Sequence, residues 1–165
     1  MSQESKCIAI IGAPNHGKKT LCKVIEKTIK DNMLNSPKAN YTFIVPVSCR
    51  EFIKDVISGK IKVNGVVLGV SAKQGPMPET REYILVCRQL GINRMVVYIN
   101  NDDEDNTSVL LNTTKDTINL LNEYEFYDDD VFIVEGSAKN ALNHSDVESI
   151  ERLIEVLDNF DKEEI

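Results

Sequence analysis

Short apolar runs and amphipathic stretches alternate along the whole chain. Five runs rich in β-branched residues read as strands buried on both faces of a parallel sheet. These predicted strands are Cys7–Ile11, Tyr41–Val45, Val66–Ser71, Met95–Ile99 and Val131–Val134. Between them apolar residues recur at helical spacing, and the predicted helices lie near Lys18–Met33, Arg50–Ile57, Pro78–Gly91, Ser108–Glu123 and Asp146–Phe160. This alternation predicts a three-layer α/β fold, with a mostly parallel sheet of about five strands and helices on both faces.

A glycine-rich loop joins the first predicted strand to the first predicted helix. Apart from one position, the sequence from Gly12 to Thr20 matches the phosphate-binding pattern G-x-x-x-x-G-K-[ST]. In such a loop the backbone N–H groups and the dipole of the following helix bind phosphate, and the lysine reaches the outer phosphates. The predicted phosphate site consists of Gly12, Asn15, His16, Gly17, Lys18, Lys19 and Thr20. A chance glycine-lysine turn is the alternative, and it leaves the flanking strand and helix unexplained.

Lys19 stands where the pattern has a Ser or Thr hydroxyl that binds Mg²⁺. The sequence therefore predicts a site that holds GDP or GTP without well-bound Mg²⁺. In one interpretation the Lys19 ammonium lies near the metal position and partly neutralises the β-phosphate. In the other it points to solvent or pairs with an acidic loop.

Size and composition narrow the class of protein. The 165 residues fit one domain, residues 1–165, with a substantial core. A net charge of −7 and a pI near 4.9 argue against nucleic acid or an anionic membrane as a general partner. The four cysteines lie far apart without a C-x-x-C pair, as expected of free thiols in a reducing compartment. Because no signal-like or membrane-spanning run is present, we expect a cytoplasmic protein.

Polar residues follow the fourth and fifth predicted strands, at the sheet edge where ligands bind in parallel α/β folds. Asn100-Asn101-Asp102-Asp103 fits the guanine-recognition pattern N-K-x-D, and Ser137-Ala138-Lys139 fits S-A-K. A carboxylate at Asp103 accepts from N1–H and from the 2-amino group of guanine. Adenine offers no such pair, so we expect discrimination of roughly 10⁴-fold.

The other members of these two loops have their own predicted roles. Asn100 would hold the loops together, the Ala138 N–H would meet guanine O6, and the Lys139 stem would cover one face of the base. Asn101 replaces the lysine that covers the other face, so we expect weaker binding with guanine preference kept. The predicted base site is Asn100, Asp103, Ser137, Ala138 and Lys139, although either loop alone also fits an ordinary polar turn.

A longer pattern, G-P-M-P-x-T-R-E-x-I-L, runs from Gly75 to Leu85. Further matching segments are Asn15–Lys18, Phe52–Gly59, Arg88–Ile92 and Gly136–Leu142. Together these motifs resemble the GTPase domain of elongation factor Tu, a translational GTPase with a P-loop NTPase fold, over most of the chain from Cys7 to Leu142. The resemblance implies guanine-nucleotide binding. We expect the two β-barrel domains that follow in the family to be absent, and direct tRNA binding to be absent with them.

The catalytic parts of the resemblance are replaced. Aligned from Tyr41, the family's D-C-P-G-H becomes Val45-Pro46-Val47-Ser48-Cys49. Val45 replaces the Asp that orients Mg²⁺, Ser48 the Gly that senses the γ-phosphate, and Cys49 the His that positions water. Most of switch I, its threonine and the edge strand before Tyr41 have no counterpart. Each such loss costs on the order of 10²–10³ in rate, so we predict no catalytic residue and no measurable hydrolysis by the family mechanism.

Three functions fit these residues. The first is a pseudo-GTPase that binds guanine nucleotide without switching and presents a fixed surface at Met77–Ile92 to a protein partner. There we expect Ile84, Leu85 and Leu90 in the core, with Glu79, Arg81, Glu82, Arg88 and Gln89 free for binding. The second function is an active GTPase that needs a partner, and the third is a nucleotide-free interaction decoy. The sequence leaves enzymatic status open among them.

Overall fold

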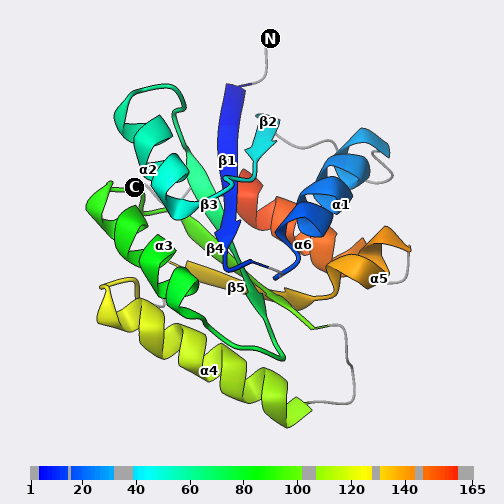
Figure 1. Ribbon diagram of the computed structural model, residues 1–165. Coiled ribbons are helices and arrows are strands. Elements are labelled where there is room, and N and C mark those ends of the chain that lie inside the picture. The colour runs from blue at the N-terminus through cyan, green and yellow to red at the C-terminus, as the bar shows by residue number, and fades with distance from the viewer. Residues whose placement is uncertain are drawn as a thin grey trace.

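The computed structural model describes residues 4–14, 16–31, 39–101, 107–127, 131–143 and 147–159 (Figure 1). Five strands form one sheet: β1 (Glu4–Gly12), β2 (Ala39–Ile44), β3 (Gly65–Ser71), β4 (Met95–Asn100) and β5 (Val131–Gly136). Their order is β2-β1-β3-β4-β5, and all four pairings are parallel. The predicted α/β fold is therefore confirmed.

Helices cover both faces of the sheet. They are α1 (Lys18–Asp31), α2 (Cys49–Ile57), α3 (Pro78–Gln89), α4 (Thr107–Glu123), α5 (Ala138–Leu142) and α6 (Val147–Asp158). Helices α2, α3 and α4 lie on one face, and α1, α5 and α6 lie on the other (Figure 1). Of the helices described, none combines the length and the apolar character needed to cross a bilayer.

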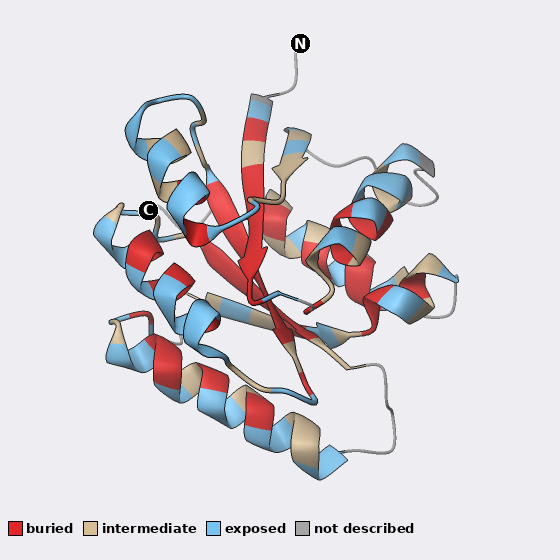
Figure 2. Ribbon diagram, in the orientation of Figure 1, coloured by how far each residue is buried: buried red, intermediate tan, exposed pale blue. Residues whose placement is uncertain are grey.

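Alternate side chains of β1 enter two separate cores. Ala9 and Ile11 pack in the cluster beneath α2, α3 and α4, while Ile8 and Ile10 pack in the cluster beneath α1, α5 and α6. Figure 2 shows buried residues along the central strands and on the inward sides of the helices. Because both faces are covered, β1 reads as an unbroken apolar run rather than an alternating one.

Observed and predicted element ends differ by a few residues. Helix α3 stops at Gln89, with Leu90 as its C-cap, and Gly91 follows with a φ of +75°. This places the glycine just after the cap, where a left-handed conformation ends a helix. Helix α5 was not predicted, because its five residues are too few to show an apolar period.

Strand β2 is an edge strand in the described part of the chain. Its Tyr41 ring stacks on Phe43 with centroids 5.7 Å apart, and the Tyr41 hydroxyl donates to Asp158 Oδ1 of α6 at 2.6 Å. These contacts fix the edge against the layer that contains α6. The edge strand expected to be missing before Tyr41 concerns residues 32–38, which lie outside the described residues.

A close contact at Gly136 lets α6 approach the sheet. A Cβ on Gly136 would lie 2.3 Å from both side-chain atoms of Ser149 and 2.6 Å from the Tyr98 hydroxyl oxygen. Those two buried hydroxyl groups form a hydrogen bond with each other at 2.9 Å. We predict that Gly136→Ala lowers the free energy of unfolding by about 1–3 kcal/mol through overpacking.

The same substitution should cost less in a Ser149→Gly background, because most of the clashing atoms are then gone. Urea unfolding of the two single variants and the double variant measures this coupling. Strictly additive losses would contradict the contact as the cause.

Candidate functional site

The loop between β1 and α1 lies flush against the end of β3. Gly12 has a φ of +143°, and a Cβ there would lie 2.4 Å from the Gly69 carbonyl oxygen. A Cβ on Gly69 would in turn lie 3.7 Å from the His16 carbonyl oxygen. Backbone conformation and contact both exclude a side chain at position 12. The close packing of Gly12 on Gly69 therefore fixes where the phosphate loop leaves the sheet.

Gly17 makes a second close approach, toward the end of β4. Its φ is +80°, and a Cβ there would lie 2.6 Å from Asn100 Nδ2. The Asn100 Oδ1 accepts a hydrogen bond from the Ala138 N–H at 3.0 Å. One side chain thus contacts the phosphate loop and the loop after β5, in the bridging position predicted for Asn100.

Lys18 folds back over the phosphate loop. Its Nζ donates to the Gly12 carbonyl oxygen at 2.7 Å and lies 5.8 Å from the centre of the Tyr83 ring. Burial lowers the pKa of Lys18, and the charge of Lys19 lowers it further. An anion beside this ammonium would offset both effects, because an opposite charge favours the protonated form.

His16 is buried, with 2% of its surface exposed, and both ring nitrogens form hydrogen bonds. The Ser71 N–H donates to Nδ1 at 3.2 Å. Nδ1 is therefore the acceptor, so Nε2 carries the proton and donates to Gln74 Oε1 at 2.8 Å. Burial is the largest cause that lowers the pKa of His16, which suits the neutral ring.

The turn that receives His16 is held by its own hydrogen bonds. The Gly75 N–H donates to the Ser71 carbonyl oxygen at 2.8 Å. The Ala72 N–H donates to the Asn100 carbonyl oxygen at 3.0 Å, and the Thr113 hydroxyl of α4 donates to the Ala72 carbonyl oxygen at 2.6 Å. The phosphate loop is thus anchored to a turn that β4 and α4 also hold.

Lys19 and Thr20 begin α1 beside Lys18. Lys19 is exposed and Thr20 is half-buried. The effect of Lys19 on the pKa of Lys18 places the two charges within electrostatic range. Both interpretations of Lys19, near the metal position or toward solvent, stay predictions.

The loop after β5 leads directly into α5. Ser137 caps this helix, because its Oγ accepts from the Asn140 N–H at 3.1 Å, and Lys139 is exposed. The Ala138 N–H, predicted to meet guanine O6, donates to Asn100 in this structure. A three-centre bond would serve both acceptors, and the O6 contact stays a prediction.

Two predicted site residues, Asn15 and Asp103, lie outside the described residues. Their roles in phosphate binding and guanine recognition stay predictions. The segments that flank them are described, and they end at the carboxyl edge of the sheet, where α/β folds bind ligands.

A family model described as the elongation factor Tu GTP binding domain matches residues 49–162, more than two thirds of the chain. The chain belongs to this family. The GTPase-domain resemblance is thereby confirmed, and with it a G domain that binds guanine nucleotide. The phosphate loop precedes the matched residues, so its place in the site is carried by the contacts described above.

In this elongation factor Tu-like domain, the positions aligned with metal and water contacts serve the fold. Val45 packs against the cluster beneath α1 and α6, and Ser48 Oγ caps α2 by accepting from the Glu51 N–H at 3.1 Å. Cys49 is buried, and burial followed by the Glu82 carboxylate raises its pKa to about 11. Such a thiol stays protonated at neutral pH and makes a poor nucleophile. With a lysine at position 19 as well, these side chains do not fit the oxygen ligation that Mg²⁺ requires.

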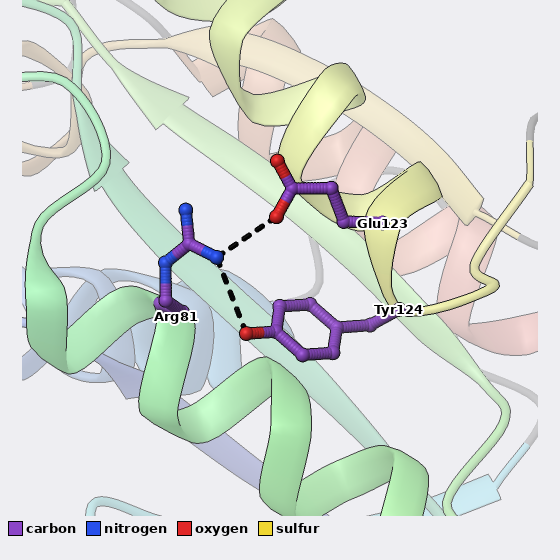
Figure 3. A network of polar contacts seen from close by, with 3 residues as sticks. All are labelled: Arg81, Glu123 and Tyr124. Carbon is purple, nitrogen blue, oxygen red and sulfur yellow. Dashed lines mark hydrogen bonds and ion pairs between the residues drawn. The ribbon is translucent and has the colours of Figure 1, made fainter.

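Two arginines of α3 are engaged by the end of α4, which corrects the expectation that they are free. Arg81 Nη1 donates to Glu123 Oε2 at 2.8 Å and to the Tyr124 hydroxyl at 3.2 Å (Figure 3). Arg88 Nη2 donates to Glu125 Oε2 at 2.5 Å. The acidic partners come more than thirty positions after these arginines in sequence, so helical spacing on α3 alone did not reveal them.

The prediction that Leu85 lies in the core was wrong. Its side chain is 37% exposed, whereas Ile84 is fully buried and Leu90 is half-buried. Leu85 lies one turn after Arg81 and one turn before Gln89, both exposed, so it occupies the solvent side of α3. Glu79, Glu82 and Gln89 are exposed, but the Glu82 carboxylate also acts on the Cys49 thiol and is therefore not free in the way expected.

A cavity of about 500 Å³ lies at the opposite edge of the sheet, between the end of α2 and the end of α3. Its walls include Val56, Lys62, Asn64 and Arg94. This is the amino edge of the strands, so the cavity is separate from the nucleotide site.

Sequence reasoning missed Gly69, Ser71, Gln74 and Tyr83 as parts of the site. They belong to β3, the turn after it and α3, and none of them is part of a phosphate-loop motif. The position of Ser71 could have revealed it, because this residue ends β3, the strand that lies next to β1. Ligand sites form where such neighbouring strands end.

Proposed function

We propose that this G domain holds GDP or GTP without hydrolysing it and acts through a fixed protein-binding surface. The proposal rests on one observation: the residues at the positions expected to be catalytic have structural roles instead. Ser48 caps a helix, Val45 is partly buried against a core cluster and Cys49 is a buried, protonated thiol. Phosphoryl transfer in this class depends on a metal ion and on positioned water, and among the described residues the three side chains at positions 45, 48 and 49 are not placed to hold either.

The phosphate cradle supports nucleotide binding. Gly12 packs on the end of β3 and Gly17 on Asn100 at the end of β4, which holds the loop at the edge where ligands bind, and the Lys18 ammonium lies beside the loop. Guanine selection by Asp103, together with Asn100 and Lys139, is part of the proposal. So is a site that functions without Mg²⁺, in which Lys19 partly replaces the charge of the metal.

A fixed surface follows from the same residues. The Ser48 hydroxyl caps α2, so the residue at the position expected to sense a γ-phosphate is held by the helix that it begins. Helix α3 is tied to α4 through Arg81 and Arg88, which favours one arrangement of Met77–Ile92 with either nucleotide. Exposed Met77 and Leu85 among the carboxylates of α3 suit a partner with apolar and basic side chains.

We also propose that the protein works in the cytoplasm. All four cysteines are free thiols, as expected in a reducing compartment.

Nucleotide content and turnover test the proposal on one purified sample. Chromatography of nucleotide released from the fresh protein should show guanine nucleotide. Steady-state GTP hydrolysis, measured alone and with ribosomes, should stay at background. Brisk phosphate release would favour an active GTPase, and absence of binding to any guanine nucleotide would favour the decoy.

Chelation tests the metal-free site. Affinity for fluorescent GDP should change less than about threefold when EDTA replaces Mg²⁺, because no hydroxyl ligand stands at position 19. The matched control is Lys19→Thr, which restores that hydroxyl and should make affinity respond to Mg²⁺. A loss of more than tenfold for the wild type on chelation would refute this part of the proposal.

A further inference from the structure

We propose that His16 is a positioning residue that fixes the nucleotide-binding form of the phosphate loop through its bond to Ser71. The inference rests on the proposed nucleotide binding and specifies what sets the lifetime of the complex. His16 need not touch the nucleotide, because its ring points away from the loop toward the turn after β3.

The two bonds of the ring differ in what they hold. Nδ1 accepts from a main-chain N–H at the last residue of β3, which is part of the sheet. Nε2 donates to the side chain of Gln74, an exposed residue with several rotatable bonds. The bond to Ser71 therefore fixes position, while the bond to Gln74 mainly favours one tautomer.

The turn to which His16 is hydrogen-bonded is itself held in place by hydrogen bonds. The Ser71 carbonyl oxygen accepts from the Gly75 N–H, and the adjacent Ala72 is bonded to both Asn100 and Thr113. Hydrogen bonds from β4, from α4 and from the turn itself thus hold the group to which His16 is attached. A loop anchored there keeps its register relative to β3 and β4.

The groups around the His16 ring affect its protonation in both directions. Burial and the charge of Lys18 both disfavour the protonated imidazole, whereas Gln74, Glu79 and the main chain at Gly69 act in the opposite direction. Protonation of Nδ1 would turn the acceptor into a donor facing the Ser71 N–H. The geometry therefore requires a neutral ring.

His16 affects nucleotide binding through the residues that follow it in sequence. Gly17 and Lys18 supply the N–H groups and the ammonium of the cradle, and they come directly after the anchored residue. Without the hydrogen bond to Ser71, the phosphate loop would adopt its nucleotide-binding form for only part of the time. Affinity falls with the competent fraction, and most of that change is expected in the dissociation rate.

Two substitutions of similar size test the inference. His16→Asn keeps an acceptor near the place of Nδ1, whereas His16→Leu has a similar branched shape without one. We expect release of fluorescent GDP from the leucine variant to be roughly tenfold faster than from wild type, since the half-buried Ser71 N–H loses its acceptor. The asparagine variant should release GDP within about threefold of the wild-type rate.

Melting temperatures of all variants separate positioning from stability. A residue that only stabilises the fold would shift melting without separating the release rates of the asparagine and leucine variants. Equal rates in those two variants, with GDP bound by the wild type, would overturn this inference alone. A wild type that binds no guanine nucleotide would overturn both the inference and the proposed function. Should the leucine variant not fold, His16→Ala provides the same comparison.

Discussion

The Lys18→Ala variant is expected to bind GDP roughly 10²–10³-fold more weakly than wild type, the usual cost of removing one partner from a desolvated, hydrogen-bonded charge pair. The structure fixes the Lys18 ammonium through its bond to the Gly12 carbonyl oxygen and its position over Tyr83. Titration with fluorescent GDP at constant ionic strength measures the loss. The melting temperature of the ligand-free variant checks that the fold survives.

The neighbouring lysine is the matched control. Lys19→Ala removes the same charge from an exposed side chain, and we expect a loss of about tenfold or less. Equal losses in the two variants would mean that only net charge matters. That outcome would contradict a specific phosphate contact by Lys18.

The second large effect is expected from Gly12→Ala, which should lower the free energy of unfolding by about 3–5 kcal/mol. The new Cβ would meet the Gly69 carbonyl oxygen at 2.4 Å, and a φ of +143° is strained for any L-residue with a side chain. Neither neighbour can move easily, because both belong to paired central strands. Since small domains have only about 5–15 kcal/mol in total, this is a large part of the stability, and we expect the melting temperature to fall by roughly 6–20 °C.

The Gly59→Ala variant separates backbone strain from steric contact as the cause of the lost stability. Gly59 has a φ of +80°, but a Cβ there would meet nothing within 4 Å, so only conformational strain of about 1–2 kcal/mol is expected. Thermal unfolding by circular dichroism compares the variants. Similar melting temperatures would show that the contact with Gly69 contributes little.

The fold could be predicted because local pattern and global architecture agree. β1 is apolar throughout its centre and is buried on both faces, and each predicted helix has one apolar side that covers the sheet. The prediction failed where the type of a residue and its position on a helix disagree. Leu85 reads as a core residue by type, yet the neighbouring turns of α3 place it toward solvent.

The candidate site was predictable to the level of motifs. The phosphate loop and the Asn100 loop do meet at the carboxyl edge, because parallel strands bring their ends together. The partners of His16 could not be predicted, since Ser71 and Gln74 are more than fifty positions away and belong to no nucleotide-binding pattern. Arg81 and Arg88 illustrate the same limit, because their acidic partners come from the end of another helix.

The residues just before α2 limit which substitutions the stability of this domain tolerates. Restoring an aspartate at position 45 would place a carboxylate where Val45 now packs against apolar side chains, and burying an unpaired charge is costly. Exchanging Ser48 for glycine would remove the hydroxyl that caps the helix. We therefore expect the Val45→Asp and Ser48→Gly variants to be less stable than wild type, so single substitutions toward the family's residues at these positions lower the stability of the domain.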